Sequence, residues 1–197
     1  ASTYARNAVW KDGVTLWSDV LDKSPDNVIA LTNLGDAWIE KGHPDNAVYY
    51  LSKAVAIRPD YAKAHYNLGF AYVRQEQFDK AIDSFNRAIT IKADYDKAYN
   101  NLAIIYMEKG HLDKAVEYFR KAININPGHA RAHYNLGIIY VKKGQLDTAV
   151  NYFKNAIAIN PDYVEAYYNL GLTYYLNGNI NSAITEYINA IRLKPDY

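Results

Sequence analysis

Apolar side chains recur along the chain with the period of amphipathic α-helices, in segments of about 13 residues. Short polar turns join these segments in pairs, as at residues 41–44 and 109–111. Glycine in such a turn favours a left-handed cap, and Pro44 suits the first turn of the helix that follows. The second segment of a pair usually ends before Pro-Asp or Pro-Gly, since proline cannot continue a helix. The pattern therefore predicts an all-α chain of helix pairs.

The helix pairs repeat with a period of 34 residues. Residues recur at this spacing in three series: Leu34, Leu68, Leu102, Leu136 and Leu170; Ala47, Ala81, Ala115, Ala149 and Ala183; Ala54, Ala88, Ala122, Ala156 and Ala190. Counting each unit from Val28 gives five whole units, 28–61, 62–95, 96–129, 130–163 and 164–197, after a partial unit, 1–27, with the end of a first helix and a second helix. One pair cannot bury its apolar face alone, so we expect the units to stack as one continuous solenoid domain.

This repeat resembles the tetratricopeptide repeat (TPR) over essentially the whole chain. The resemblance implies an α-solenoid of helix-turn-helix units in a right-handed superhelix, with the first helix of each pair lining a concave groove. Four residues depart from the family pattern: Glu76 replaces a turn glycine, Ala93 a closing proline, Ala103 a close-contact glycine and Gly13 an alanine. We expect each departure to loosen one local turn or contact.

The segment 6–27 is less regular and allows two interpretations. It resembles the junction in membrane proteins whose repeat tail follows the last membrane span, some of which are glycosyltransferases with the tail outside the cytoplasm. In that case this chain is the recognition arm of a larger membrane protein, in the periplasm or a lumen. Alternatively Tyr4, Trp10 and Trp17 simply fill packing positions of the partial unit, and a cytoplasmic location stays open.

A second apolar stripe follows the first helices on the side that repeat packing does not require. Unit positions 2, 5, 6, 9, 12 and 13 lie on this side, where an amphipathic helix is normally polar. It carries Tyr66, Phe70, Tyr134, Ile138, Tyr168, Leu172 and Tyr175. An exposed apolar strip usually marks a binding surface, so the stripe predicts a ligand groove. The alternative is that neighbouring first helices cover the stripe themselves.

Asparagine occupies unit position 6 throughout, at Asn33, Asn67, Asn101, Asn135 and Asn169. A carboxamide has two donors and an acceptor, so it can pair with both polar groups of a peptide bond. The series therefore predicts a ladder that holds an extended chain by its backbone. Such a ladder is similar to the one lining the repeat superhelix of O-linked N-acetylglucosamine transferase. The alternative is that each asparagine bonds only locally.

Composition and motifs argue against other functions. The formal charge is +1, which indicates neither nucleic acid nor a membrane surface as a direct partner. Lysine and arginine slightly exceed the acids on the groove side, which favours a ligand with some acidic character. His129 and His133 have the spacing of a metal pair, but repeat packing explains both. With no cysteine and no catalytic motif, we expect no enzyme, metal or cofactor.

The sequence thus predicts a scaffold that binds a protein or peptide segment through the asparagine ladder and the apolar pockets. A different class of function is a structural module that self-associates end to end through its solenoid ends. We expect the last helix to expose an apolar edge formed from Ile184, Ile188 and Ile191, which either kind of partner would cover.

Overall fold

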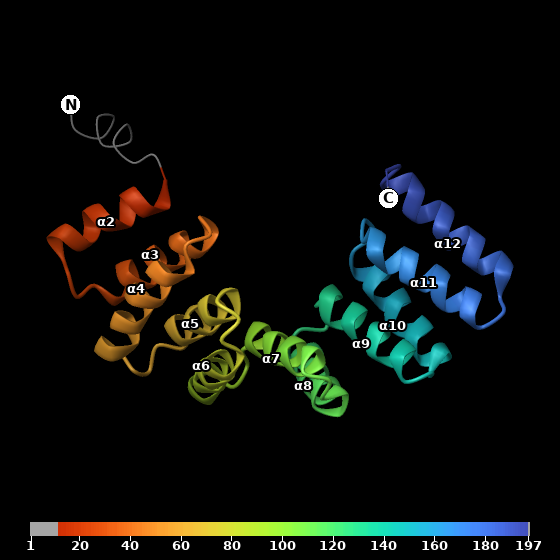
Figure 1. Ribbon diagram of the computed structural model, residues 1–197, viewed down its shortest axis with the longest axis horizontal. Helices are drawn as coiled ribbons and strands as arrows, with labels where there is room; N and C mark the ends of the chain where they lie inside the picture. Colours follow the sequence, from red (N-terminus) through yellow and green to blue (C-terminus); the bar gives the residue numbers. More distant parts are fainter. Residues whose placement is uncertain (1–11, 197) are drawn as a thin grey trace. The chain divides into compact units, whose positions relative to one another are not determined.

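The computed structural model describes residues 12–196, which form eleven α-helices and no strand (Figure 1). The helices of the first half are α2 (Gly13–Lys23), α3 (Val28–Glu40), α4 (Pro44–Ile57), α5 (Ala62–Arg74) and α6 (Phe78–Ile91). Those of the second half are α7 (Asp96–Glu108), α8 (Leu112–Ile125), α9 (Ala130–Lys142), α10 (Leu146–Ile159), α11 (Val164–Leu176) and α12 (Ile180–Leu193). The chain divides into two compact units, residues 1–98 and 99–197. None of the described helices is long and apolar enough to cross a membrane.

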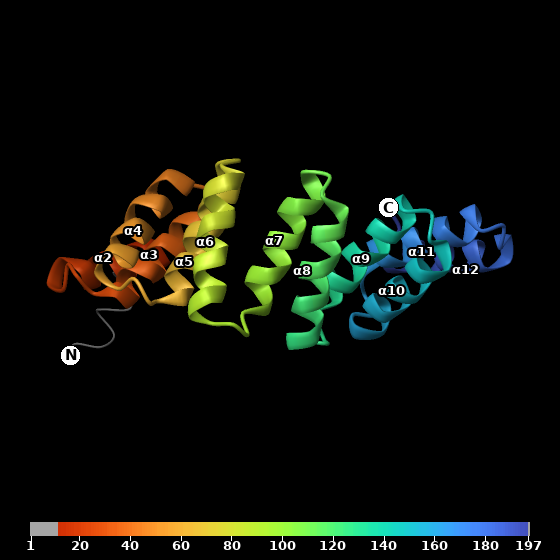
Figure 2. The same ribbon diagram turned by 90° about the horizontal axis from the view of Figure 1, so that it is seen from below.

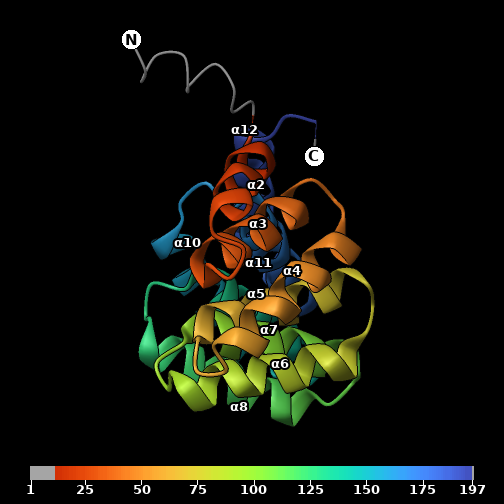
Figure 3. The same cartoon turned by 90° about the vertical axis from the view of Figure 1, so that its left-hand side faces the viewer.

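In the first unit, helices pack in chain order, α2 on α3, α3 on α4, α4 on α5 and α5 on α6 (Figure 2). Figure 3 looks onto this unit from the end at which α2 lies in front of α3. Leucines and alanines from successive helices fill the space between them. Leu31 packs with Ala54 and Ala64, and Leu51 packs with Leu68. Helices α3, α4 and α5 are therefore each held by the helix before and the helix after, as repeat stacking requires.

In the second unit, α8 packs on α9, α9 on α10, α10 on α11 and α11 on α12. Its core is one cluster that includes Phe119, Leu136, Ile139, Phe153 and Leu170, each at most 1% exposed. Burying a side chain of this size contributes about 1.5–3 kcal/mol relative to leaving it in water. The cluster spans several helix pairs, so the pairs stabilise one another.

In several helix pairs a glycine of the first helix lets a large side chain of the second helix approach closely: a leucine at Gly35 and an aromatic ring at Gly69, Gly137 and Gly171. A Cβ atom on Gly137 would lie 2.5 Å from the ring of Phe153, and one on Gly69 would lie 2.8 Å from the ring of Phe85. Ala103 stands at this position in the third unit and is fully buried. The glycine that directly follows the recurring leucine therefore marks a close approach within these helix pairs.

The turns inside the helix pairs have the expected left-handed residue. Gly42, Gly110, Gly144 and Gly178 have φ between 70° and 78°. Glu76 takes the same place with φ of 58°, a conformation that side chains other than glycine adopt at a cost. Glu76 thus keeps the turn and carries backbone strain.

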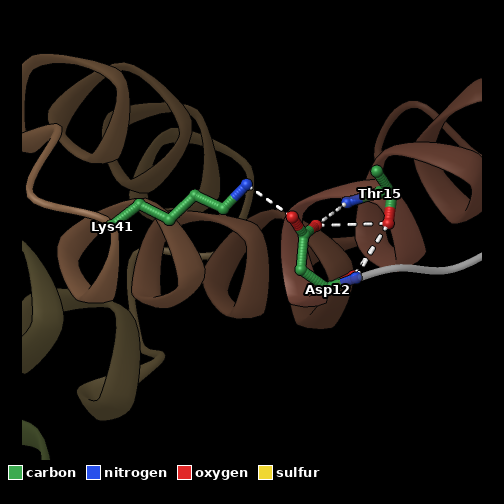
Figure 4. A network of polar contacts seen from close by, with 3 residues as sticks. All are labelled: Asp12, Thr15 and Lys41. Atoms are coloured by element: carbon green, nitrogen blue, oxygen red, sulfur yellow. Dashed lines mark hydrogen bonds and ion pairs between the residues drawn. The ribbon is translucent and has the colours of Figure 1, made fainter.

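Helix α2 starts late compared with the other second helices, with 11 residues against 14. Asp12 caps it: its carboxylate accepts from the Thr15 amide at 2.9 Å and pairs with Lys41, the residue directly after α3 (Figure 4). A Cβ on Gly13 would lie 3.2 Å from that of Ala37, so glycine here allows a close contact and leaves no gap. Trp17 packs against a buried cluster of Val14, Leu34 and Ala37. Tyr4 and Trp10 lie outside the described residues.

Candidate interaction surface

The residues of the predicted apolar stripe lie on the first helices α5, α9 and α11 and differ in exposure. Phe70, Ile138 and Leu172 are half-buried. Tyr168 and Tyr175 on α11 are 42% and 58% exposed. The stripe is therefore partly covered along its length and most open on α11.

Tyr134 is covered by aromatic residues of its own repeat. Its ring lies 4.9 Å from the ring of Tyr163 and 5.8 Å from that of Phe153, measured between centroids. Within the first unit, Tyr66 lies 4.9 Å from Tyr95 in the same way. These two tyrosines therefore contribute to packing within their own repeats as well as to the surface.

Tyr95 and Tyr163 were not among the residues that the sequence pattern predicts for the site. Both occupy unit position 34, directly before the next first helix, and Tyr61 also stands there. Burial, together with the nearby phenol of Tyr134, raises the pKa of Tyr163 to about 12. Burial raises the pKa of Tyr95 as well. Both side chains are thus neutral at physiological pH, and the recurrence of tyrosine at this position was the available signal.

Three of the five asparagines bond within the protein. The amide nitrogen of Asn169 lies 2.8 Å from the carbonyl oxygen of Glu165 and 3.1 Å from the hydroxyl of Tyr134. The side-chain oxygen of Asn33 accepts from Lys63 at 3.0 Å. The oxygen of Asn101 lies 3.5 Å from the amide nitrogen of its neighbour, Asn100. Hydrogen bonds within the protein, some of them to the adjoining repeat, thus occupy at least one atom of each.

Asn67 differs from these three. It is 5% exposed, and its amide nitrogen has no hydrogen-bond partner among the described residues. A buried donor without a partner costs about 1–3 kcal/mol, so a hydrogen-bond acceptor at this nitrogen would be stabilising. Asn135 is likewise buried, at 7% exposure.

Asn67 lies at the wall of a hollow of about 440 Å³ in the first unit. The other lining residues are Asp36, Lys63, Tyr66, Lys92, Tyr95, Asp96 and Lys97. The lining therefore includes three ammonium groups and two carboxylates beside two stacked tyrosine rings. A hollow of this kind suits a short side chain with an acidic or amide end, next to an aromatic wall.

The histidines have structural contacts. A ring nitrogen of His65 lies 2.9 Å from the carbonyl oxygen of Pro59, and one of His133 lies 3.2 Å from that of Pro127. Burial lowers the pKa of His133, which favours its neutral form. Within residues 12–196, no three side chains that could bind a metal come together. His65 and His133 thus anchor the loops before α5 and α9, respectively.

Comparison with known proteins identifies the repeat. The family model described as TPR repeat matches residues 35–76, 104–144 and 137–178, more than half of the chain. The chain belongs to the tetratricopeptide repeat family. A second model, described as tetratricopeptide repeat, matches residues 62–95 and 164–197 of this TPR chain. A search of curated protein sequences found no match.

Solved structures of TPR proteins are similar over most of the chain. YrrB, described as a TPR protein with an unusual peptide-binding site, is 23% identical with a TM-score of 0.71, covering 92% of this chain and 93% of its own. MamA is 25% identical with a TM-score of 0.75, covering 83% of this chain and 95% of its own. Pseudomonas aeruginosa pilF is 20% identical with a TM-score of 0.78, covering 84% and 75%. The TPR family supports a protein–protein interaction scaffold, and these neighbours share its fold.

Proposed function

We propose that this TPR chain binds an extended protein segment on the side of its first helices that faces away from the repeat core. TPR repeats generally serve as non-catalytic scaffolds, and we place this chain in that class. Peptide binding would parallel YrrB, a TPR protein with an unusual peptide-binding site. Within this chain, the hollow of the first unit and the exposed apolar residues of the second unit each support the proposal.

The observation that carries the proposal is the buried, unpartnered amide nitrogen of Asn67 beside the hollow. A ligand carbonyl that accepts from this nitrogen would remove the cost of the unmade hydrogen bond. Lys63 and Lys97 line the same hollow and favour a ligand with an acidic side chain nearby. In this interpretation Asn67 binds the ligand backbone, and the lysines select its side chain.

The second unit offers a more apolar contact surface. Tyr168 and Tyr175 are exposed on α11, with half-buried Leu172 between them at helical spacing. Ile138 on α9 and the amide of Asn135 belong to the same side. Aromatic residues supply much of the binding energy at protein interfaces. We propose that apolar side chains of the ligand pack on these residues.

A display library of random peptides, selected on the full chain, supplies a probe for this surface. The selected peptide is then measured by fluorescence anisotropy against the wild type and against Lys97→Glu. We expect this substitution to weaken binding about tenfold, because a carboxylate in the hollow repels an acidic ligand. Lys53→Glu makes the same charge change at an exposed position of α4 and should leave affinity unchanged. Equal affinity of all three chains, or no selected peptide at all, would overturn the proposal.

A further inference from the structure

A polar link between adjoining repeats recurs at the end of the first helix. It joins unit position 14, directly after this helix, to an aspartate in the first turn of the preceding second helix. Within the first compact unit, Gln75 donates to the carboxylate of Asp45 at 2.6 Å. Within the second, the amide nitrogen of Asn177 donates to the carboxylate of Asp147 at 3.0 Å. Asn177 thus ties the last repeat to the repeat before it.

Position 14 carries a cation or a neutral amide in every whole repeat: Lys41, Gln75, Lys109, Lys143 and Asn177. Both kinds of group can donate to the aspartate, and the hydrogen bond from Lys143 lowers the pKa of Asp113. The position also lies at the C-terminal end of a helix, where the helix dipole disfavours negative charge. A carboxylate at position 14 would therefore be repelled by both the helix end and the aspartate.

Asn177 differs from the other four residues because it can turn into such a carboxylate without an enzyme. Gly178 follows it, and no other asparagine of the sequence precedes a glycine. Glycine has no side chain that keeps its backbone nitrogen away from the preceding carboxamide, and asparagine is among the thermally labile residues. Residues 177–179 form the exposed turn between α11 and α12 (Figure 1). Water therefore reaches the carboxamide and its neighbouring backbone.

We propose that Asn177 is a site of spontaneous deamidation, and that its conversion loosens the last repeat. The backbone nitrogen of Gly178 forms a bond to the side-chain carbonyl carbon of Asn177. The bond from that carbon to the amide nitrogen breaks, and ammonia leaves with the proton of the glycine nitrogen. Water then adds to one of the two carbonyl carbons of the resulting succinimide and opens the ring. The product is aspartate or isoaspartate, so an amide and water have become a carboxylate and an ammonium ion.

The folded turn sets the pace of this reaction. The N–H of Gly178 donates to the carbonyl oxygen of Tyr175 at 3.0 Å, while the side chain of Asn177 is held by Asp147. Both hydrogen bonds have to open before the glycine nitrogen reaches the side-chain carbon. Exposed helix ends open locally at low cost, and the loss of ammonia is not reversed. Conversion therefore accumulates with time from a minor, opened form of the turn.

The product changes the contact between α10 and α11. A donor 3.0 Å from the carboxylate of Asp147 becomes a second carboxylate, so attraction turns into repulsion. The new charge also stands at the C-cap of α11, the unfavourable end of that helix. The same turn leads into α12, which is capped by Asn179. Deamidation thus weakens the attachment of the last repeat.

Peptide mapping by mass spectrometry, after prolonged incubation of the full chain at mildly alkaline pH, tests the reaction. We expect residue 177 to exchange its amide for a carboxyl group faster than the other asparagines, with isoaspartate among the products. Asn177→Gln is the matched control, because Gln75 makes the same link and a glutamine would have to close a larger ring. After equal incubation the wild type should have lost thermal stability, and this variant should not.

Asn177→Asp tests the consequence, because it supplies the aspartate product at once. We expect the melting temperature to fall by roughly 2–4 °C and amide hydrogen exchange to rise in α11 and α12. Asn181→Asp makes the same charge change in the first turn of α12, at the unit position where the other whole repeats have aspartate. A helix N-terminus favours a carboxylate, so this control should not lower the melting temperature.

Two results would overturn the proposal. The first is a residue 177 that keeps its amide while Asn181 or another asparagine converts, or while none converts at all. The second is an Asn177→Asp chain that melts with the wild type or loses no more stability than Asn181→Asp.

Discussion

The side-chain amide of Asn169 donates a hydrogen bond to the hydroxyl of Tyr134, with 3.1 Å between the two atoms. Asn169 lies on α11 and Tyr134 on α9, so the bond joins the first helices of successive repeats. Both residues belong to the side predicted to hold a ligand. The same side chains that line this surface therefore also fix the spacing of the repeats.

We expect Tyr134→Phe to lower the free energy of unfolding by about 1 kcal/mol, because the hydrogen bond is lost while the aromatic contacts remain. Urea denaturation followed by circular dichroism measures the change. In an Asn169→Ala background the same substitution should cost much less, since its partner is already absent. Tyr175→Phe is the control, because its ring is 58% exposed. An equal cost in both backgrounds would show that the bond contributes nothing.

Glu76→Gly should stabilise the chain. Glu76 has φ of 58°, and glycine adopts this conformation without the clash of a Cβ atom. We expect the free energy of unfolding to rise by about 1 kcal/mol. Gly144→Glu makes the reverse change at an equivalent turn with φ of 70°, where a Cβ would meet nothing within 4 Å. It should destabilise by a similar amount. If both substitutions change stability in the same direction, backbone strain is not the cause.

The carboxylate of Asp12 should titrate unusually low. A hydrogen bond from Lys41 lowers its pKa to about 2, helped by the amide of Thr15 (Figure 4). Because the folded-state pKa is depressed, this carboxylate stabilises the fold above roughly pH 4 and loses that contribution as the pH falls towards 2. Lys41→Met should raise the pKa in a carbon-detected NMR titration. Lys23→Met, which removes the partner of Asp19, should leave the Asp12 titration unchanged.

The helix bounds could be predicted because they depend on local residues. A left-handed glycine separates the helices within a pair, as at Gly42, and proline or a turn follows the second helix. Glycine beside an aromatic ring, as at Gly137 and Phe153, also recurs with the repeat. These signals act over a few residues or within one helix pair. They therefore survive in a single sequence without knowledge of how the repeats stack.

The fate of the asparagines could not be predicted, because it depends on the neighbouring repeat. Asn169 finds the hydroxyl of Tyr134 at position 5 of the preceding unit. For Asn67 the corresponding residue is Thr32, whose hydroxyl already donates to the carbonyl of Val28 at 2.7 Å. The amide nitrogen of an asparagine at the same unit position thus has a hydrogen-bond partner at Asn169 and none among the described residues at Asn67. Whether a neighbour can reach depends on packing distances that the sequence pattern does not contain.

Asn67→Leu should make the chain more stable. The substitution removes a buried amide nitrogen that has no partner among the described residues, and the adjoining hollow gives the branched side chain room. We expect the free energy of unfolding to rise by about 1 kcal/mol. Asn169→Leu is the matched control at the same unit position, and it should destabilise because it breaks the bonds to Glu165 and Tyr134. Thermal and urea denaturation of both variants measure the difference. If Asn67→Leu destabilises as much as Asn169→Leu, then the amide of Asn67 already has a partner in the unliganded chain, and its unmade hydrogen bond is no longer a reason to place a ligand there.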